Sequence, residues 1–313
     1  MQRLARAALL FIAIGLALYA GVYYAAEQLM LRNARSNPMF KIATAPQQRF
    51  DWVILGASHA MPLDFADFQT QIERETNLKL LNLAAPGAGP LYNRFVLEQF
   101  LRAHQTRNLL YVVDSFAFYS RNWNEERFTD AKLLRRTPLA QSVALRLCDY
   151  TRREGVSRLA LVDYISGFSK INNRERWQRD VWDGEAQFER AYQPSSSAIK
   201  KRIDYLYPDQ TPPAALTRYL EQLSRLVALA RQQGVNVVVI KMPLPPKFYG
   251  QLPAEADFDA ELSRLLGARG VPWHDFSARV SDPGLYFDTD HLNRTGLTGF
   301  LLRDLKPVLM AGG

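Results

Sequence analysis

Short apolar runs recur along this chain of 313 residues, and stretches with helical periodicity separate them. Each run is apolar throughout instead of alternating with polar residues, which is typical of strands that are buried on both faces. Strands that alternate with helices favour right-handed crossovers and a parallel sheet covered by helices on both sides. The five predicted strands are residues 51–56, 78–83, 108–114, 235–241 and 271–276.

The connections between these strands differ in length. An amphipathic helix that Pro90 opens is predicted before the third strand, and further helices precede the fourth and fifth strands. Residues 120–210 break the rhythm, because they are rich in Trp, Arg and Tyr and show no further strand pattern. We therefore predict a three-layer α/β sandwich with a five-stranded parallel sheet, and a helical insertion at about 120–210.

The N-terminus carries twenty uncharged residues, from Ala7 to Ala26. As a helix they would span about 30 Å, the hydrocarbon thickness of a bilayer. Arg3 and Arg6 precede them, which favours a cytoplasmic N-terminus. We predict a single transmembrane anchor at residues 1–30 in the inner (cytoplasmic) membrane. A polar stalk at 31–50 and a domain at 51–311, facing the periplasm or cell exterior, follow it. A buried helix of a globular protein is the alternative, and whether the segment is cleaved stays open.

Composition narrows the class of partner. Lys and Arg number 39 against 31 Asp and Glu, but the excess is scattered and forms no long basic block. We therefore expect no nucleic-acid partner. Attraction to anionic lipid headgroups or to an acidic polymer stays open. The single cysteine, Cys148, excludes an internal disulfide and a Cys-based zinc site, and we expect no cofactor and no metal.

Polar or glycine-rich segments follow the predicted strands, where an open parallel sheet binds its ligands. Ser58 follows the first strand, Gly87 follows the second, and Asp288 and His291 follow the fifth. His291 could take the proton of a nucleophilic Ser58, while Asp288 holds the imidazole in the required tautomer. Gly87 would let a backbone N–H approach the developing oxyanion.

Each of these features also has a structural explanation. Ser58 could cap a strand-to-helix turn, and Gly87 could supply a positive φ. Asp290 could cap the following helix, and His291 could be an interior histidine. Their joint occurrence at the strand ends favours the catalytic interpretation.

The segments "GASH", "NLAAPG" and "DTDH" resemble the signatures of the SGNH (GDSL-like) hydrolase superfamily over residues 51–119 and 235–311. The resemblance implies a flavodoxin-like fold and a catalytic set of Ser58, Asp288 and His291, with Gly87 in the oxyanion hole. The family's asparagine block falls on "VVDS", which puts Asp114 where an asparagine is expected. An ionised aspartate cannot donate a hydrogen bond to an oxyanion, so Ser115 or another donor would be needed, or Asp114 has another role.

Together with the anchor, these segments resemble extracytoplasmic SGNH-like proteins such as alginate O-acetylation proteins and the DltD family. That resemblance implies a serine O-acyltransferase or esterase that acts on a polysaccharide, with a membrane-bound O-acyltransferase as partner. Two alternatives stay open: a non-catalytic protein that binds glycans or a partner, and a lipase that acts on membrane lipids. The acyl donor and acceptor, the choice between transfer and hydrolysis, and the oligomeric state stay undetermined. Three tryptophans of the insertion would suit sugar stacking or packing: Trp123, Trp177 and Trp182.

Overall fold

The computed structural model of the protein describes residues 1–130, 133–175 and 177–312. Its centre is a five-stranded sheet in which all paired strands run parallel, in the order β2-β1-β3-β4-β5. This is the 2-1-3-4-5 order of flavodoxin-like folds, and it confirms the predicted fold class. The strands are β1 (Arg49–Gly56), β2 (Leu80–Asn82), β3 (Gln105–Val112), β4 (Asn236–Lys241) and β5 (Trp273–Asp275).

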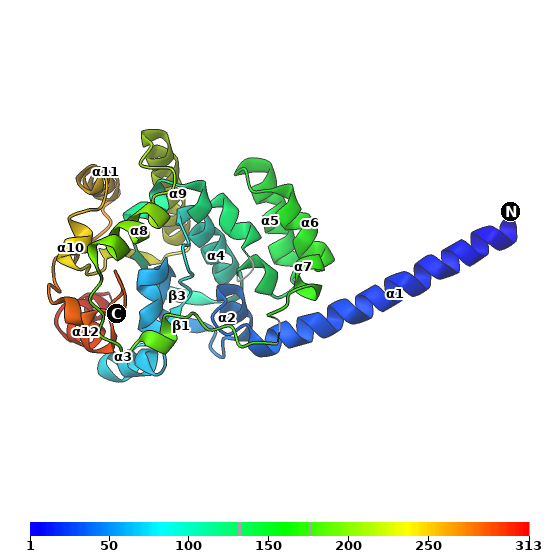
Figure 1. Ribbon diagram of the computed structural model, residues 1–313, viewed down its shortest axis with the longest axis horizontal. Coiled ribbons are helices and arrows are strands. Elements are labelled where there is room, and N and C mark those ends of the chain that lie inside the picture. Colours follow the sequence, from blue (N-terminus) through cyan, green and yellow to red (C-terminus); the bar gives the residue numbers. More distant parts are fainter. Residues whose placement is uncertain (131–132, 176, 313) are drawn as a thin grey trace.

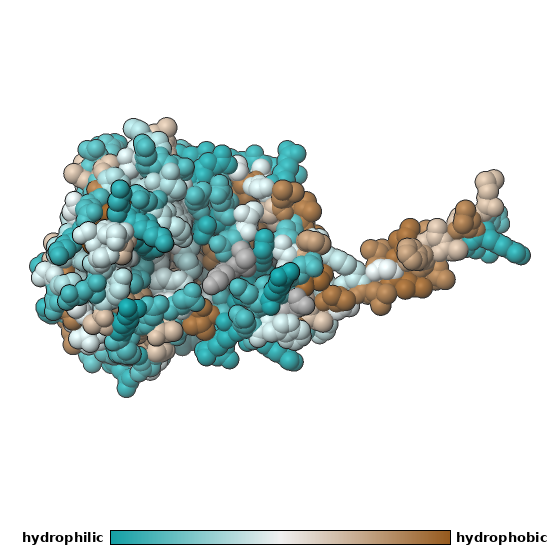
Figure 2. Space-filling view, viewed as in Figure 1, coloured by the Kyte–Doolittle hydropathy of each residue, from teal (hydrophilic) through white to brown (hydrophobic). Residues whose placement is uncertain are grey.

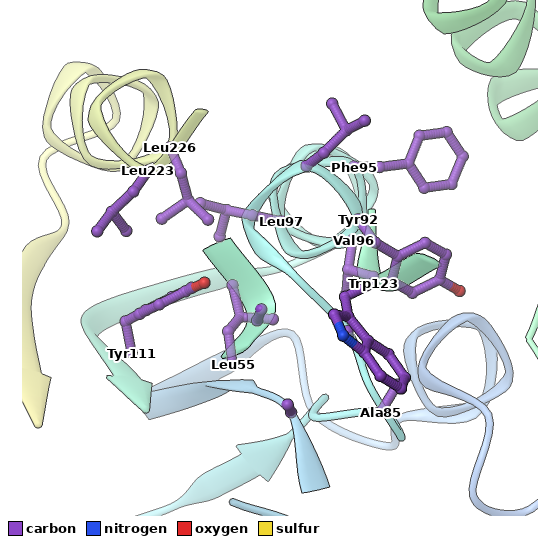
Figure 3. Close-up of a cluster of buried hydrophobic side chains, with 14 of the residues drawn as sticks. Leu55, Ala85, Tyr92, Phe95, Val96, Leu97, Tyr111, Trp123, Leu223 and Leu226 are labelled. Atoms are coloured by element: carbon purple, nitrogen blue, oxygen red, sulfur yellow. The ribbon is translucent and has the colours of Figure 1, made fainter. Parts of the chain in front are cut away.

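Helices cover both faces of the sheet (Figure 1). On β1, Val53 and Leu55 point into one apolar core, whereas Trp52 and Ile54 point into the other. Successive strand residues face opposite sides, so burial on both sides explains why the strands are apolar throughout. Figure 3 shows the first core, where β1 and β3 meet α4 and α9.

The helices divide between these two cores. The first core includes residues of α4 (Pro90–Ala103), α9 (Pro213–Gln232) and α11 (Glu255–Ala268). The second includes residues of α3 (Phe68–Thr76), α12 (Arg294–Phe300) and α13 (Lys306–Ala311), with a π-helical turn joining the last two helices.

The predicted insertion lies between β3 and β4. It begins with short 3-10 segments and continues through α5 (Gln141–Arg153), α6 (Arg158–Ser166), α7 (Phe168–Ile171) and α8 (Ser196–Leu206). Its Trp123 is buried in the first core, and its Trp182 packs against the second.

The N-terminal helix α1 (Gln2–Asn33) extends away from the domain (Figure 1). It is long and apolar enough to cross a membrane. The structure of residues 31–50 differs from the polar stalk that the sequence predicts. Residues 31–50 hold the end of α1, the helix α2 (Pro38–Thr44) and the start of β1, and Met39 and Ile42 are buried in the first core. This segment packs against the domain because its apolar side chains are buried against α4.

Candidate active site

The loops that follow the strands bring the predicted polar residues to one edge of the sheet. Ser58 is the first residue of the 3-10 segment η1 (Ser58–Asp64), two residues after β1 ends. Asp114 lies two residues beyond β3, and His291 lies just before α12. The rings of His291 and of His59, the residue after Ser58, have centroids 4.6 Å apart. The first and last of these loops, more than two hundred residues apart in the chain, therefore share one site.

His291 and Asp288 form a close pair. Both carboxylate oxygens of Asp288 lie 2.9 Å from Nδ1 of His291. Oδ1 of Asp288 also accepts hydrogen bonds from the backbone N–H groups of Asp290 and His291. This turn fixes the carboxylate, and the carboxylate in turn favours the tautomer that carries its proton on Nδ1. The other nitrogen, Nε2, is then free to accept a proton.

Ser58 precedes His59 in the chain and is buried, as His291 is. It is 5% exposed, and His291 is 1% exposed. Nε2 of His291 is buried and has no hydrogen-bond partner in the part of the chain that the structure describes, so it is not bonded to Ser58 here. Catalytic hydrogen bonds are often longer in the absence of substrate. The structure thus places the residue after Ser58 beside His291, without a hydrogen bond between Ser58 and His291.

His59 pairs with Asp114, a contact that the sequence analysis missed. Nδ1 of His59 lies 2.5 Å from Oδ1 of Asp114. Burial by itself lowers the pKa of His59, but the charge and hydrogen bond of Asp114 and the charge of Asp290 outweigh burial and raise the pKa to about 10. His59 is therefore an imidazolium at neutral pH. The sequence signal was available, since two of only four histidines lie in the "GASH" and "DTDH" segments.

Asp290 lies between the two histidines and is fully buried. Its Oδ2 is 3.3 Å from Nε2 of His59, and its Oδ1 is 3.5 Å from Nδ1 of His291. Arg202 of α8 donates to both oxygens of Asp290 at 2.9–3.0 Å. Burial raises the pKa of Asp290, but Arg202 and the histidines reverse this and hold the pKa well below its usual range. Asp290 is not the helix cap considered above, because Asn293 accepts from the N–H of Gly296 at the start of α12.

Three of these residues also offer atoms that could hold a metal ion. Ligand atoms of His59, Asp290 and His291 all lie within 4.8 Å of one another. Both histidines hold a carboxylate on Nδ1, as metal-ligating histidines often do. However, Arg202 already neutralises Asp290, and a metal ion would have to displace the proton that Asp114 and Asp290 favour on His59. The donor set therefore suits a divalent cation less well than proton-transfer chemistry.

The predicted oxyanion residues have different surroundings. Gly87 has φ +60°, and a Cβ there would lie 2.5 Å from the ring of Trp123, so the turn and the packed indole both require glycine. Ser115 donates to Glu255 and pairs with the hydroxyl of Tyr207 at 2.7 Å. It is thereby tied into a network away from His59. Among the described residues, the backbone N–H groups of Ser58 and Gly87 have no hydrogen-bond partner.

Trp182 covers one side of His291, with their ring centroids 5.0 Å apart. The same indole lines a pocket of about 200 Å³, together with Phe65 and Met61. The wall of this pocket is mixed in charge, because Arg35, Lys41 and Arg179 line it together with Asp64, Asp180 and Glu185. Neither Ser58 nor His291 lines the pocket, so this part of the insertion separates the pocket from the candidate catalytic atoms.

The fold and the site define an α/β protein of the doubly wound parallel type, with a buried cluster of serine, histidine and aspartate at the carboxyl ends of its strands. No family model and no curated protein matches the chain. Two solved structures from Bacteroides are similar to it at low identity. In each case the likeness covers most of both chains.

One comes from Bacteroides fragilis, and its description gives acylhydrolase as a suggested activity. It has 11% identity, covers 86% of this chain and 94% of its own, and gives a TM-score of 0.40. The other is described as a GDSL-like lipase from Bacteroides thetaiotaomicron. It has 9% identity, with 87% and 95% covered, and a TM-score of 0.40. The fold assignment rests on the order and direction of the strands.

Proposed function

We propose that this protein is a serine-dependent esterase or O-acyltransferase that works through an acyl-Ser58 intermediate. One observation carries the proposal. His291 holds Asp288 on Nδ1 and keeps a free Nε2, inside a buried cluster that Ser58 adjoins. This is the arrangement that a general base needs in order to activate a serine.

In the proposed reaction, Oγ of Ser58 attacks the acyl carbonyl carbon while its proton passes to Nε2 of His291. The tetrahedral intermediate collapses, the ester C–O bond breaks, and the leaving alkoxide takes the proton from His291. Water or an acceptor hydroxyl then attacks the acyl-Ser58 carbonyl and gives its proton to His291. Collapse of this second intermediate returns the proton to Ser58.

The developing oxyanion needs hydrogen-bond donors. The free N–H groups of Ser58 and Gly87 are two candidates. Asp114 cannot donate while it is ionised, but it holds the His59 imidazolium 2.5 Å away. Nε2–H of His59 lies within 3.3 Å of Asp290 without the alignment of a hydrogen bond. We propose that this N–H takes the place of the missing asparagine donor.

We further propose that α1 anchors the domain in the inner membrane, with the domain outside the cytoplasm, and that the acyl acceptor is a cell-surface polysaccharide. A membrane-bound O-acyltransferase would supply the acyl group. The length and apolar character of α1 support the anchor. The pocket beside Trp182 offers an indole, which suits a sugar ring, and charged groups of both signs that could bind its hydroxyls.

The test is ester cleavage by the purified full chain in detergent, with a chromogenic acetyl ester as substrate. We expect Ser58→Ala to lower kcat by about four orders of magnitude or more. Ser277→Ala is the matched control, because Ser277 is 4% exposed and follows β5 outside the cluster. Equal activity in wild type and Ser58→Ala would remove the proposal. Acetyl transfer to oligosaccharides, measured by mass spectrometry, separates transferase from hydrolase.

A second candidate function is non-catalytic binding of a glycan or partner, and the closed site favours it, since Ser58 is 5% exposed. A fluorophosphonate probe distinguishes the two. An enzyme should be labelled at Ser58, and His291→Ala should abolish that labelling. A binding protein should remain unlabelled while its ligand binding survives Ser58→Ala.

A further inference from the structure

The outer face of α6 and the start of α7 carry large apolar side chains that solvent reaches. A spacing of three residues puts the α6 members on one side of the helix. Figure 2 shows apolar surface on the domain beside the point where α1 leaves it. We name this set the α6–α7 apolar face; its members and their exposed fractions are Leu159 (74%), Val162 (61%), Ile165 (54%) and Phe168 (62%).

Several contacts attach this face to α1. The hydroxyl of Tyr19 donates to the carbonyl of Ser166 at 2.9 Å. The ring of Tyr23 packs so closely against Gly167 that a Cβ there would lie 2.5 Å from it. Lys170, which is buried, forms an ion pair with Glu27 of α1. The face therefore keeps a set position along the helix.

The length of α1 then determines the depth of the face. The uncharged run starts at Ala7, and Tyr19 forms a hydrogen bond to the domain. The twelve residues from Ala7 to Leu18 span only about 18 Å as a helix. A hydrocarbon core of about 30 Å needs about 20 residues, which takes it to Ala26. A bilayer spanned by α1 must therefore reach past the Tyr19 contact by roughly 12 Å, to the level of α6 and α7.

We propose that the α6–α7 apolar face is immersed in the membrane leaflet on the domain's side, in contact with lipid acyl chains. The proposal rests on the proposed anchor. Moving these four large apolar side chains from water into lipid is favourable, by about 25 cal/mol per Å² of apolar surface removed from water. A pocket of about 480 Å³, lined by Tyr19, Leu159 and Phe168 and also by Arg135 and Asp163, has room for part of an acyl chain. Arg158, exposed beside Leu159, suits a lipid phosphate.

Immersion would hold the domain against the bilayer in one orientation. Because the domain is attached to α1, an anchor alone would let helix and domain tilt together in the bilayer, whereas a second contact with lipid removes that freedom. The candidate active site would then keep a set height and direction relative to the membrane surface. For an enzyme that receives acyl groups from a membrane-embedded partner, this would keep Ser58 in register with the donor.

The test uses the full chain with Cys148→Ser, reconstituted into vesicles of phosphatidylcholine and phosphatidylglycerol. Single cysteines are introduced as Phe11→Cys in α1, Val162→Cys on the face and Ser197→Cys on α8, and each is labelled with an environment-sensitive fluorophore. All three side chains are exposed, so the labels need not disturb the fold. Quenching is measured with acyl-chain nitroxide lipids and, separately, with iodide in the water.

We expect the label at position 162 to lose most of its fluorescence to the nitroxide lipids and to resist iodide, as the label at position 11 should. The label at position 197 should behave in the opposite way. If position 11 is quenched by the lipids while position 162 is reached by iodide, the anchor stands and the immersed face is wrong. If position 11 is reached by iodide, both the anchor and the immersed face are wrong.

Discussion

Nδ1 of His59 lies 2.5 Å from Oδ1 of Asp114, the residue that stands where the resemblance to SGNH hydrolases leads one to expect an asparagine. An asparagine would donate to the oxyanion directly. Here the carboxylate instead stabilises a neighbouring imidazolium, whose pKa is raised to about 10. This pairing is consistent with the proposal that His59, the residue after the serine, donates to the oxyanion in place of residue 114.

Asp114→Asn tests this explanation. We expect it to lower kcat by about 10²–10³-fold, because His59 loses the Asp114 charge that favours its imidazolium form, and a neutral imidazole is a weaker oxyanion donor. The measurement is steady-state ester hydrolysis at neutral pH, with His59→Gln as the companion variant. The two losses should not add, since both changes remove the same donor. An increase in activity on Asp114→Asn would mean that the amide itself serves as the donor and that His59 does not.

The titration of His59 should appear in the stability of the protein. Its pKa is higher in the folded chain, at about 10, than its ordinary value of 6.5. The stabilisation is therefore fully present below about pH 6.5 and is lost as the pH rises toward 10. Over this window the free energy of unfolding of wild type should fall relative to His59→Gln by up to about 1.4 kcal/mol per pH unit. Denaturant unfolding across the window checks this, and parallel curves for the two proteins would contradict it.

Asp288→Asn should separate catalysis from folding. Asn keeps an oxygen that can accept from the backbone N–H groups of Asp290 and His291, which Asp288 now satisfies. The Asp288 side chain is also about a third exposed. We expect unchanged thermal stability but a loss in kcat of about 10⁴-fold, because the imidazole loses its tautomer and charge partner. A loss of less than tenfold would show that His291 does not depend on Asp288.

Arg202→Met should destabilise the fold by about 3–5 kcal/mol, because it leaves the buried carboxylate of Asp290 without its cation. Arg202 helps to keep the pKa of Asp290 well below 3.8. The ion pair therefore contributes its full stabilisation above pH 3.8, and this contribution is lost as the pH falls toward the lowered pKa and Asp290 takes up a proton. The difference in the free energy of unfolding between wild type and Arg202→Met should therefore become smaller in acid. Denaturant midpoints at neutral and acidic pH measure both effects, with Arg190→Met, an exposed arginine outside the cluster, as control.

Chelation tests the remaining use of the cluster of His59, Asp290 and His291. If it serves proton transfer and charge stabilisation, exhaustive dialysis against EDTA should leave ester hydrolysis unchanged. Added Zn²⁺ should inhibit the proposed hydrolysis by competing for Nε2 of His291. Loss of activity on chelation, restored by one divalent metal, would reassign the cluster as a metal centre.

Much of the fold was predictable because the apolar pattern depends on local burial. The five strands lie within a few residues of their predicted positions, and the helix at Pro90 and the insertion are where the sequence indicates. The segment 31–50 was predicted as a stalk because its overall composition is polar. Two of its apolar residues, Met39 and Ile42, are nevertheless buried in the core. Composition describes the average over a segment, whereas each side chain is buried or exposed according to its own position in the fold.

In the candidate site, too, some features could be predicted from local sequence and others could not. Ser58, Asp288 and His291 could be proposed because they stand at strand ends and next to turn residues, both of which the sequence reveals. The partnership of His59 with Asp114 and the ion pair of Asp290 with Arg202 could not. These pairs join residues 55 and 88 positions apart, and no local pattern reports such a contact.

By itself, the sequence determined the alternation of strands and helices, the apolar N-terminal helix and the order in which polar residues follow the strands, because these depend on neighbours along the chain. The tertiary structure decided which charges meet. It made His59 a cation, withdrew Ser115 into a network with Glu255 and set the apolar side chains of α6 beside α1. The reason is physical: the charge state of a group and the exposure of a side chain depend on what surrounds it in space, and that exists only once the chain has folded.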